Sequence, residues 1–358
     1  MTPAGFYLWD GTTQQWVVRR QASTVSGTDR SQLVEGVDEP TALTTGVIPG
    51  TTLQDVNGNQ TINGQSYYTM SPGESLSNKR FNCRVRAAAG ASLYNCRILG
   101  WPVASPSTST NYAMLDLTPV GGTADRFYGE SLDFTPAPAN VGPANTGIRG
   151  NGGTFKYCYG SNLPDGIMCY GAGGTLIIRQ SLFEKPFTTW PSADPTRTDG
   201  EATHSDCFVQ VEGGNFEAYG CKGSAVYYDP QTNQPYDDPG QPEWGGRYLP
   251  ITNGAGWSVL LSSGNAQTPG NVLFQNGWME GGEIPVYIVG TVPTGTISFS
   301  GTRIRRGLVG IPNPTSTRWH IIKAGAGVVV NTSGMVTCTD DRSSWTPDGG
   351  SLSISNSG

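Results

Sequence analysis

The residues best suited to chemistry lie together in one short stretch, namely Asp199, Glu201, His204 and Asp206. His204 and Asp206 are two residues apart, so on a β-strand their side chains share a face. A carboxylate beside an imidazole could supply the general acid and base that cleave a glycan. The simpler interpretation is that both side chains cap a turn through hydrogen bonds to the backbone. The sequence leaves both interpretations open.

Glu212 is the third candidate for catalysis. If Val209 and Val211 point into the protein, Glu212 points outward from the same strand. There it could pair across coils with Glu217, Glu280 or a neighbouring Gln, and two carboxylates ~5–9 Å apart suit glycoside hydrolysis. The alternative is a carboxylate on a solvated outer face.

A second set of residues is suited to binding rather than reaction. These aromatic residues lie in and around two polar, Pro-containing insertions, and they are Trp190, Tyr227, Tyr228, Tyr236, Trp244 and Tyr248. Aromatic rings rimmed by Asn, Gln and Asp suit sugar rings, and they equally suit a protein interface. The alternative interpretation is that these aromatic residues bind nothing and that their loops pack back against the side of the protein.

Metal and cofactor chemistry has little support in the sequence. The pairs Asp237-Asp238 and Asp340-Asp341 lack the regular spacing of a calcium loop. A structural zinc site is not expected either, because there are only two His and no CxxC pair. We therefore expect no metal and no cofactor. The seven Cys are predicted to be free thiols, packed as small apolar residues in a protein made in a reducing cytoplasm.

The elements that must position these residues are strands. The chain has 358 residues, of which 50 are Gly and 25 are Pro, and only 14% are charged. Such a composition excludes helical bundles and coiled coils, and it indicates a turn-dense, all-β protein. The net charge of −6 and the absence of a basic stripe argue against nucleic acid as a partner. No apolar run is long enough to insert into a membrane.

A repeated pattern predicts the architecture. Short strands at 166–170, 207–211, 257–261 and 285–289 are each followed by a Gly turn, a second strand, a small-residue bend and a third strand. The Gly residues of these turns are Gly174, Gly214, Gly270 and Gly295, with a weaker copy at Gly153. Stacked units of this kind form a right-handed parallel β-helix. We expect each Gly to need a positive φ or to allow a close approach between coils.

The domain organisation follows from this pattern. Residues 1–46 are predicted to form an N-terminal β arm and linker, starting with a small hairpin around an Asp-Gly turn. Residues 47–340 are predicted to form the β-helix, and 341–358 a C-terminal cap or tail. Because insertions on one joint of a solenoid often build its binding face, we expect 183–206 and 229–246 to do so.

Four stretches, in this order, resemble minor tail proteins of phages that infect actinobacteria. The first is the opening coils, with residues 50–53 and then 81–98, where Asn82-Cys83-Arg84-Val85 recurs as Asn95-Cys96-Arg97-Ile98. The others are residues 165–167, 203–214 and 278–286. The resemblance extends from about residue 48 to about residue 338. It implies a β-helical, fibre-like or spike-like component of the virion tail, made in the host bacterial cytoplasm. It also implies a homotrimer that contacts other tail proteins, through the N-terminal arm, and the host surface.

The function expected from the sequence is therefore structural support and host recognition in a phage tail, without catalysis. The ligand would be an envelope glycan or protein of the host cell. One alternative is a polysaccharide depolymerase, either a glycoside hydrolase or a lyase, acting through His204, Asp206 and Glu212. The other alternative is a purely structural subunit of the tail tip.

Overall fold

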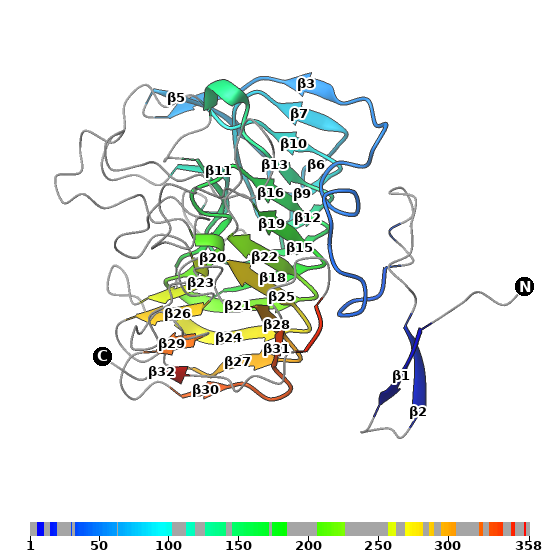
Figure 1. Cartoon of the computed structure of the whole chain (residues 1–358). Coiled ribbons are helices and arrows are strands. Elements are labelled where there is room, and N and C mark those ends of the chain that lie inside the picture. Colours follow the sequence, from blue (N-terminus) through cyan, green and yellow to red (C-terminus); the bar gives the residue numbers. More distant parts are fainter. Residues whose placement is uncertain are drawn as a thin grey trace, which may run out of the picture.

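The computed structural model describes residues 6–10, 15–19, 30, 33–62, 64–101, 112–118, 126–140, 145–171, 174–184, 206–225, 257–262, 269–281, 286–289, 295–305, 322–324, 329–338, 345–347 and 354–355. In this part of the chain the strands form three long sheets and one separate hairpin (Figure 1). The described residues contain no α-helix, and η2 (Pro138–Asn140) is a short 3-10 turn. Accordingly, none of their helices is long and apolar enough to cross a membrane. The all-β prediction is confirmed.

The three sheets are named here by their order around a coil. Sheet 1 has ten strands: β3 (Gln54–Val56), β7 (Lys79–Phe81), β10 (Arg97–Ile98), β13 (Asp133–Phe134), β16 (Tyr159–Ser161), β19 (Leu182–Glu184), β22 (Lys222–Ala225), β25 (Trp278–Gly281), β28 (Arg303–Arg305) and β31 (Val336–Cys338). Sheet 2 has eleven strands: β4 (Gln60–Ile62), β5 (Gln65–Thr69), β8 (Arg84–Arg86), β11 (Tyr112–Asp116), β14 (Asn145–Arg149), β17 (Ile167–Cys169), β20 (Asp206–Val211), β23 (Trp257–Ser262), β26 (Val286–Val289), β29 (Ile322–Ala324) and β32 (Ile354–Ser355). Sheet 3 has nine strands: β6 (Ser75–Ser77), β9 (Ser92–Tyr94), β12 (Tyr128–Glu130), β15 (Thr154–Lys156), β18 (Thr175–Arg179), β21 (Gly214–Tyr219), β24 (Pro269–Gln275), β27 (Ile297–Ser300) and β30 (Val330–Asn331).

The chain visits the sheets in rotation, and from β5 on each strand pairs in parallel with the one three strands further on. For example, β16, β17 and β18 belong to sheets 1, 2 and 3, and β19 then pairs with β16. The one antiparallel pair within these sheets joins β4 to β5 at the first coil. This rotation confirms the predicted parallel β-helix and its three-strand unit, and the right-handed sense stays a prediction.

The interior of the coil is a stack of apolar side chains. On sheet 3, Phe155, Ile178, Ala218, Phe274 and Phe299 succeed one another in register, and all are buried. The rings of Phe274 and Phe299 are stacked, with their centroids 4.7 Å apart. Like residues on successive coils therefore build one continuous core, as expected for a unit that cannot bury its inner face alone.

The three joints of a coil differ greatly in length. From sheet 3 to sheet 1 most connections span two residues, such as 180–181 and 276–277. From sheet 1 to sheet 2 the connections include 185–205, 226–256 and 306–321. The long insertions therefore concentrate on one joint, which confirms the expectation from the sequence.

The short joint from sheet 3 to sheet 1 is a corner in the left-handed backbone region. In successive coils one residue of this joint has a φ between 45° and 68°: Asn78, Asn95, Ser131, Tyr157, Gln180, Gly220, Asn276, Gly301 and Gly334. Except for Gly334, it is the first residue of the joint. In most coils the next residue is small and points inward, as Cys158, Ser181 and Cys221 do. The hydroxyl of Ser181 donates to the carbonyl of Arg179 (2.8 Å), so the corner satisfies its own polar groups.

Where the chain enters sheet 3 from sheet 2, Asn side chains of one coil bind the backbone of the next coil beside a Gly, and we call this repeat the Gly–Asn ladder. The Asn215 Oδ1 accepts the backbone N–H of Asn271 in the next coil (2.8 Å), and the Asn271 Oδ1 accepts that of Thr296 (3.0 Å). A Cβ on Gly270 would lie 2.3 Å from the Asn215 Oδ1, and one on Gly295 would lie 2.5 Å from the Asn271 Oδ1. Each Gly thus leaves room for the Asn of the previous coil.

These positions refine the prediction about the turn glycines. Gly153 and Gly214 have φ values of 88° and 69°, so for them the expected positive φ is confirmed. Gly174 lies outside the left-handed region, but its Cβ would lie 2.6 Å from the Asn151 Oδ1. Close approach between coils explains Gly174, as it does Gly270 and Gly295.

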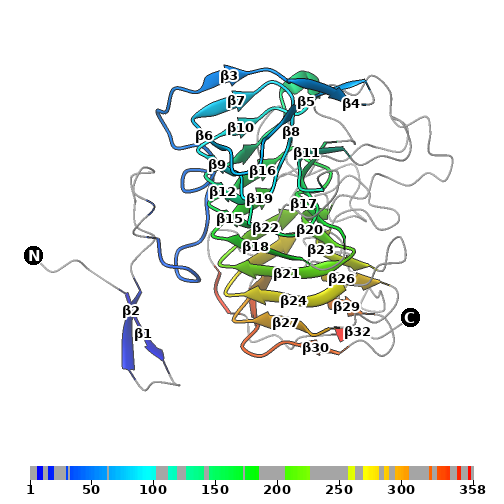
Figure 2. The same cartoon turned by 180° about the vertical axis from the view of Figure 1, so that it is seen from behind.

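A segment before the first coil packs along the short corner, and we call Arg30 together with residues 33–49 the strap. In both views it runs beside β9, β12 and β15 (Figures 1 and 2). Gly46 N donates to the carbonyl of Tyr157 (2.7 Å), and Ile48 N donates to the Asn95 Oδ1 (2.7 Å). The corner is therefore covered by the chain itself.

Two further features concern the ends and the repeat. β1 (Phe6–Asp10) and β2 (Gln15–Arg19) pair antiparallel with Trp9 opposite Trp16, which confirms the predicted hairpin. Near the other end, β32 pairs in parallel with β29.

The recurring Asn-Cys-Arg motif is not a coil repeat, because Arg84 belongs to sheet 2 and Arg97 to sheet 1.

Candidate functional site

The roots of the two longest insertions lie side by side. Residues 185–205 leave sheet 1 from β19, and 226–256 leave it from β22, its parallel neighbour, with Leu182 opposite Lys222. They return to sheet 2 at β20 and β23, which are also paired, with Asp206 opposite Trp257. The parallel ladder of sheet 1 therefore brings the starts of the two insertions together, and that of sheet 2 brings their ends together.

A row of polar side chains on the outer face of sheet 1 follows these roots. Ser161, Glu184, Ser224 and Glu280 lie in register on successive strands. Thr135, just after β13, extends the row, with its hydroxyl 3.3 Å from the hydroxyl of Ser161. This polar row is where carboxylates and hydroxyls gather beside the insertions.

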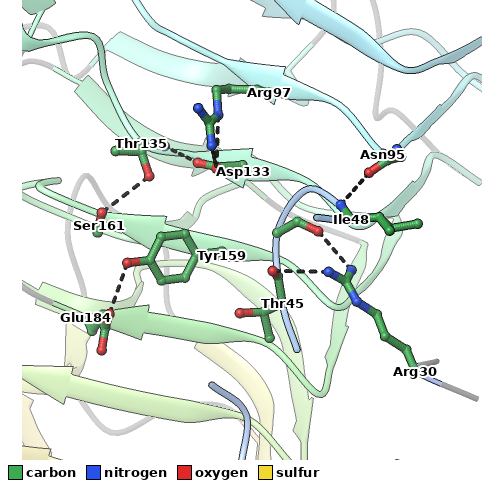
Figure 3. Close-up of polar contacts among 11 residues, drawn as sticks. Arg30, Thr45, Ile48, Asn95, Arg97, Asp133, Thr135, Tyr159, Ser161 and Glu184 are labelled. Atoms are coloured by element: carbon green, nitrogen blue, oxygen red, sulfur yellow. Dashed lines mark hydrogen bonds and ion pairs between the residues drawn. The ribbon is translucent and has the colours of Figure 1, made fainter. Parts of the chain in front are cut away.

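Each carboxylate near this row has a partner within the sheet (Figure 3). Asp133 lies in the adjacent row and binds the Arg97 guanidinium through two bonds of 2.6 and 3.0 Å. Glu184 accepts a hydrogen bond from the Tyr159 hydroxyl (2.9 Å). Burial and the Glu184 carboxylate raise the pKa of Tyr159, which keeps the phenol protonated as a donor.

Glu280 is the most enclosed carboxylate of the row, with 5% of its surface exposed. It is paired with Arg305 and with Lys222 Nζ (3.1 Å), and it accepts the Ser224 hydroxyl (2.9 Å). Lys222 Nζ also binds Glu39 of the strap (2.7 Å). We call Glu39, Lys222, Ser224, Glu280 and Arg305 the ionic latch.

Trp345 and the charges of the latch determine how enclosed Glu280 is and in which direction its pKa shifts. The Arg305 guanidinium lies over the Trp345 ring, 3.9 Å from its centroid, so the C-terminal segment covers the latch. Burial alone would raise the pKa of Glu280, but Lys222 and Arg305 outweigh it, and the pKa is lowered. A general acid needs a raised pKa, so Glu280 is suited to structural pairing rather than to proton donation.

Glu212 is the only predicted catalytic residue whose side chain the structure describes. It lies just after β20 and accepts a hydrogen bond from Gln210 Nε2 (2.6 Å). Burial raises its pKa, and Arg149 and Gln210 oppose the rise. Its expected partners lie on other faces, because Glu217 belongs to β21 in sheet 3 and Glu280 to β25 in sheet 1. The hydrogen bond that the structure gives Glu212 is therefore with a neighbouring Gln, and pairing with Glu217 or Glu280 stays a prediction.

The remaining predicted residues lie outside the described residues. This applies to His204 and to the aromatic residues Trp190, Tyr227, Tyr228, Tyr236, Trp244 and Tyr248. Asp206 is described only in its backbone, as the first residue of β20. Trp190 and His204 belong to the first of the two insertions, and the five other aromatic residues belong to the second. Sequence and topology thus assign them to neighbouring connections of one joint.

The sequence pointed to Glu280 as a possible partner of Glu212, but it did not predict the polar row. Ser161, Glu184, Ser224 and Glu280 come from four separate segments, and only the register of sheet 1 aligns them. Within the described ranges, no group of three or more His, Cys, Asp or Glu could hold a metal ion. Comparisons with protein-family models, with curated proteins and with solved structures found no match.

Proposed function

We propose that this protein is a component of a phage virion tail that supports the tail and recognises the host cell surface. The observation that carries the proposal is the pair of long insertions rooted side by side on one joint of a rigid solenoid. Loops held by a rigid scaffold are the usual carriers of binding residues. The aromatic residues of both insertions would contact an envelope glycan or protein.

The polar row supports recognition rather than catalysis. Asp133, Glu184 and Glu280 are each bound by an arginine, a lysine or a tyrosine of the same sheet. Six described Cys are free thiols, which supports folding in a reducing cytoplasm such as that of the host bacterium. The N-terminal arm would attach to other tail proteins, and a homotrimer remains part of the proposal.

Replacing residues 229–246 by a short Gly-Ser linker tests the recognition role. We expect the labelled variant to lose most of its adsorption to actinobacterial cells, while its melting temperature stays within a few degrees of wild type. The fold should persist because loop length costs little in a solenoid held by its ladders. Flow cytometry of cells with bound protein measures adsorption.

A matched control and two contrary outcomes complete the test. Replacing residues 306–321, on the same joint but a different coil, should leave adsorption unchanged. Equal adsorption of the 229–246 variant and wild type would favour a purely structural subunit. New reducing ends released from host envelope polysaccharide by the purified protein would favour the depolymerase.

A further inference from the structure

The outer face of sheet 3 carries an uncovered pair of tyrosines. Among the described residues, six large hydrophobic side chains are exposed, and only Tyr94 (43%) and Tyr128 (39%) are aromatic. They lie on the adjacent strands β9 and β12, where Tyr128 is opposite Ser92 and Tyr94 is opposite Glu130. The two rings are thus diagonal neighbours on one face, with Cα atoms about 8 Å apart by ladder geometry.

Polar groups frame the two rings. The Ser92 hydroxyl donates to the Ser75 hydroxyl (2.8 Å), and the Tyr128 hydroxyl donates to the Glu130 carboxylate. Thr154 lies opposite Tyr128 on the following strand. We call Ser75, Ser92, Tyr94, Tyr128, Glu130 and Thr154 the tyrosine platform. Because parallel strands hold the backbone, the platform is rigid before any ligand arrives.

The composition of the platform restricts what could bind to it. Ser and Glu are depleted at the centres of protein interfaces, and here they surround both rings. Lys156 lies opposite Glu130. The Arg30 guanidinium of the strap also interacts with Glu130 and Tyr94, but it is buried and donates to the Ser131 hydroxyl and the Gly46 carbonyl. The charges that the platform presents to a ligand therefore nearly balance, and neither a polyanion nor a polycation is favoured. Sugar rings have apolar C–H faces and hydroxyl edges, and this platform offers a counterpart for each.

We propose that the tyrosine platform binds a neutral polysaccharide, with sugar faces on Tyr94 and Tyr128. The hydroxyl edges would meet the Ser75 hydroxyl and the Glu130 carboxylate. Because the two Cα atoms are about 8 Å apart by ladder geometry, one extended sugar chain can reach both rings. The inference rests on the proposed function, because the platform would be a ligand site used in host recognition. It places this ligand on sheet 3, however, and the insertions connect sheets 1 and 2.

Tyr219 on the same face provides a matched control. The Arg179 guanidinium lies over its ring, 4.0 Å from the centroid, and its hydroxyl donates to Glu217 (2.8 Å). Arg179 is in turn fixed by Glu35 of the strap (2.8 Å). This ring has the same chemistry and belongs to the same sheet, but one of its faces is already covered.

Affinity electrophoresis of the full-length protein tests the proposal. The probes are gels containing soluble arabinogalactan, mannan or dextran, with polygalacturonate as a charged comparison. Wild type should be retarded by at least one neutral polysaccharide. The double variant Tyr94→Ala/Tyr128→Ala should lose affinity by about tenfold or more, since both stacking surfaces are gone. Tyr219→Ala should behave as wild type, and Tyr94→Phe/Tyr128→Phe should keep most of the retardation.

Several outcomes would overturn the proposal. These are no retardation of wild type in any neutral gel, equal retardation of the double Ala variant, or retardation by polygalacturonate alone. A change of sedimentation coefficient in the double variant without a change of retardation would identify a protein interface instead. Melting temperatures confirm that the variants are folded.

Cell adsorption separates this inference from the proposed function. If the double Ala variant loses retardation in the neutral gels but adsorbs to cells as wild type does, the platform binds polysaccharide and the insertions alone carry host recognition. If wild type binds a neutral polysaccharide but no cells, the platform holds and host recognition fails.

Discussion

At the scale of the residue, glycine in this protein has two separate tasks. Gly214 takes a φ of 69°, which side-chain-bearing residues rarely adopt. Gly270 has an ordinary φ but leaves room for the Asn215 side chain of the previous coil. The same sequence pattern, a glycine before a strand, therefore reflects strain at one position and close packing at the other.

A double-mutant cycle separates the two tasks. Gly270→Ala should destabilise the protein by about 1–3 kcal/mol, because its Cβ collides with the Asn215 Oδ1. Asn215→Ala alone should cost about 0.5–1.5 kcal/mol, because the exposed Asn271 N–H exchanges the Asn215 Oδ1 for water. Combined, the two should cost at least about 0.5 kcal/mol less than their sum, measured by chemical denaturation.

Gly214→Ala is the control for this cycle. Its cost comes from the positive φ and from a Cβ that would lie 3.0 Å from both the Asn151 Nδ2 and the Gly171 carbonyl. Neither involves the Asn215 side chain, so Asn215→Ala should not relieve the cost. Additive costs for Gly270→Ala and Asn215→Ala would contradict the Gly–Asn ladder.

At the scale of the element, the ionic latch joins three segments distant in sequence. Glu39 comes from the strap, Lys222 and Glu280 come from neighbouring strands of sheet 1, and Trp345 covers the group near the C-terminus. A buried carboxylate between two cations stabilises a fold only while all partners are present. The latch therefore fixes the strap to the later coils.

Glu280→Gln tests the latch and predicts a pH dependence. At pH 7 the variant should be less stable by about 3 kcal/mol, because Arg305 and Lys222 lose their buried partner. The pKa of Glu280 is lower in the folded protein than in the unfolded chain. Its contribution is therefore complete above the unfolded value of about 4.3 and is lost as the pH falls through the folded value. Denaturation curves should show the gap narrowing below about pH 4.

Glu39→Gln is the matched control, because Glu39 is a more exposed partner of Lys222. Its loss should cost less than about 1 kcal/mol. A gap between wild type and Glu280→Gln that stays constant from pH 7 to pH 3 would show that Glu280 is not the ionised partner.

At the scale of the whole molecule, the solenoid is stabilised by contacts between neighbouring coils. In such a stack the end coils have one neighbour and the middle coils have two, so opening begins at the ends. Buried free thiols occur along its length: Cys83, Cys96, Cys158, Cys169, Cys221 and Cys338. They can therefore report where the stack opens.

Thiol labelling at pH 8 should follow this order. Burial raises the pKa of Cys83 to about 11 and that of Cys169 to about 12, so the native thiols are nearly unreactive. In mild denaturant, Cys83 and Cys338 should react before Cys158 and Cys221, as measured by mass spectrometry of labelled peptides. Simultaneous labelling of all four would mean that the stack opens as one unit.

The sequence by itself determined the repeating unit of this protein. Alternating apolar residues, a glycine before the second strand and a small residue at the bend recur because each coil must present the same inner face. Local pattern is sufficient for this, since strand period and turn chemistry depend on neighbours along the chain. The hairpin and the joint that carries the insertions were predictable for the same reason.

Only the tertiary structure decided which residues meet across coils. Tyr157 and Gln180 take φ values of 55° and 45° although neither is Gly or Asn, and no local rule predicts that corner. Stacking of the coils imposes this conformation, because every coil must turn the same corner directly beside the corner of its neighbour. The strap then donates Gly46 N–H to the carbonyl of Tyr157. The ionic latch and the tyrosine platform have the same origin: the register of parallel strands, set by the whole stack, places residues from distant segments side by side.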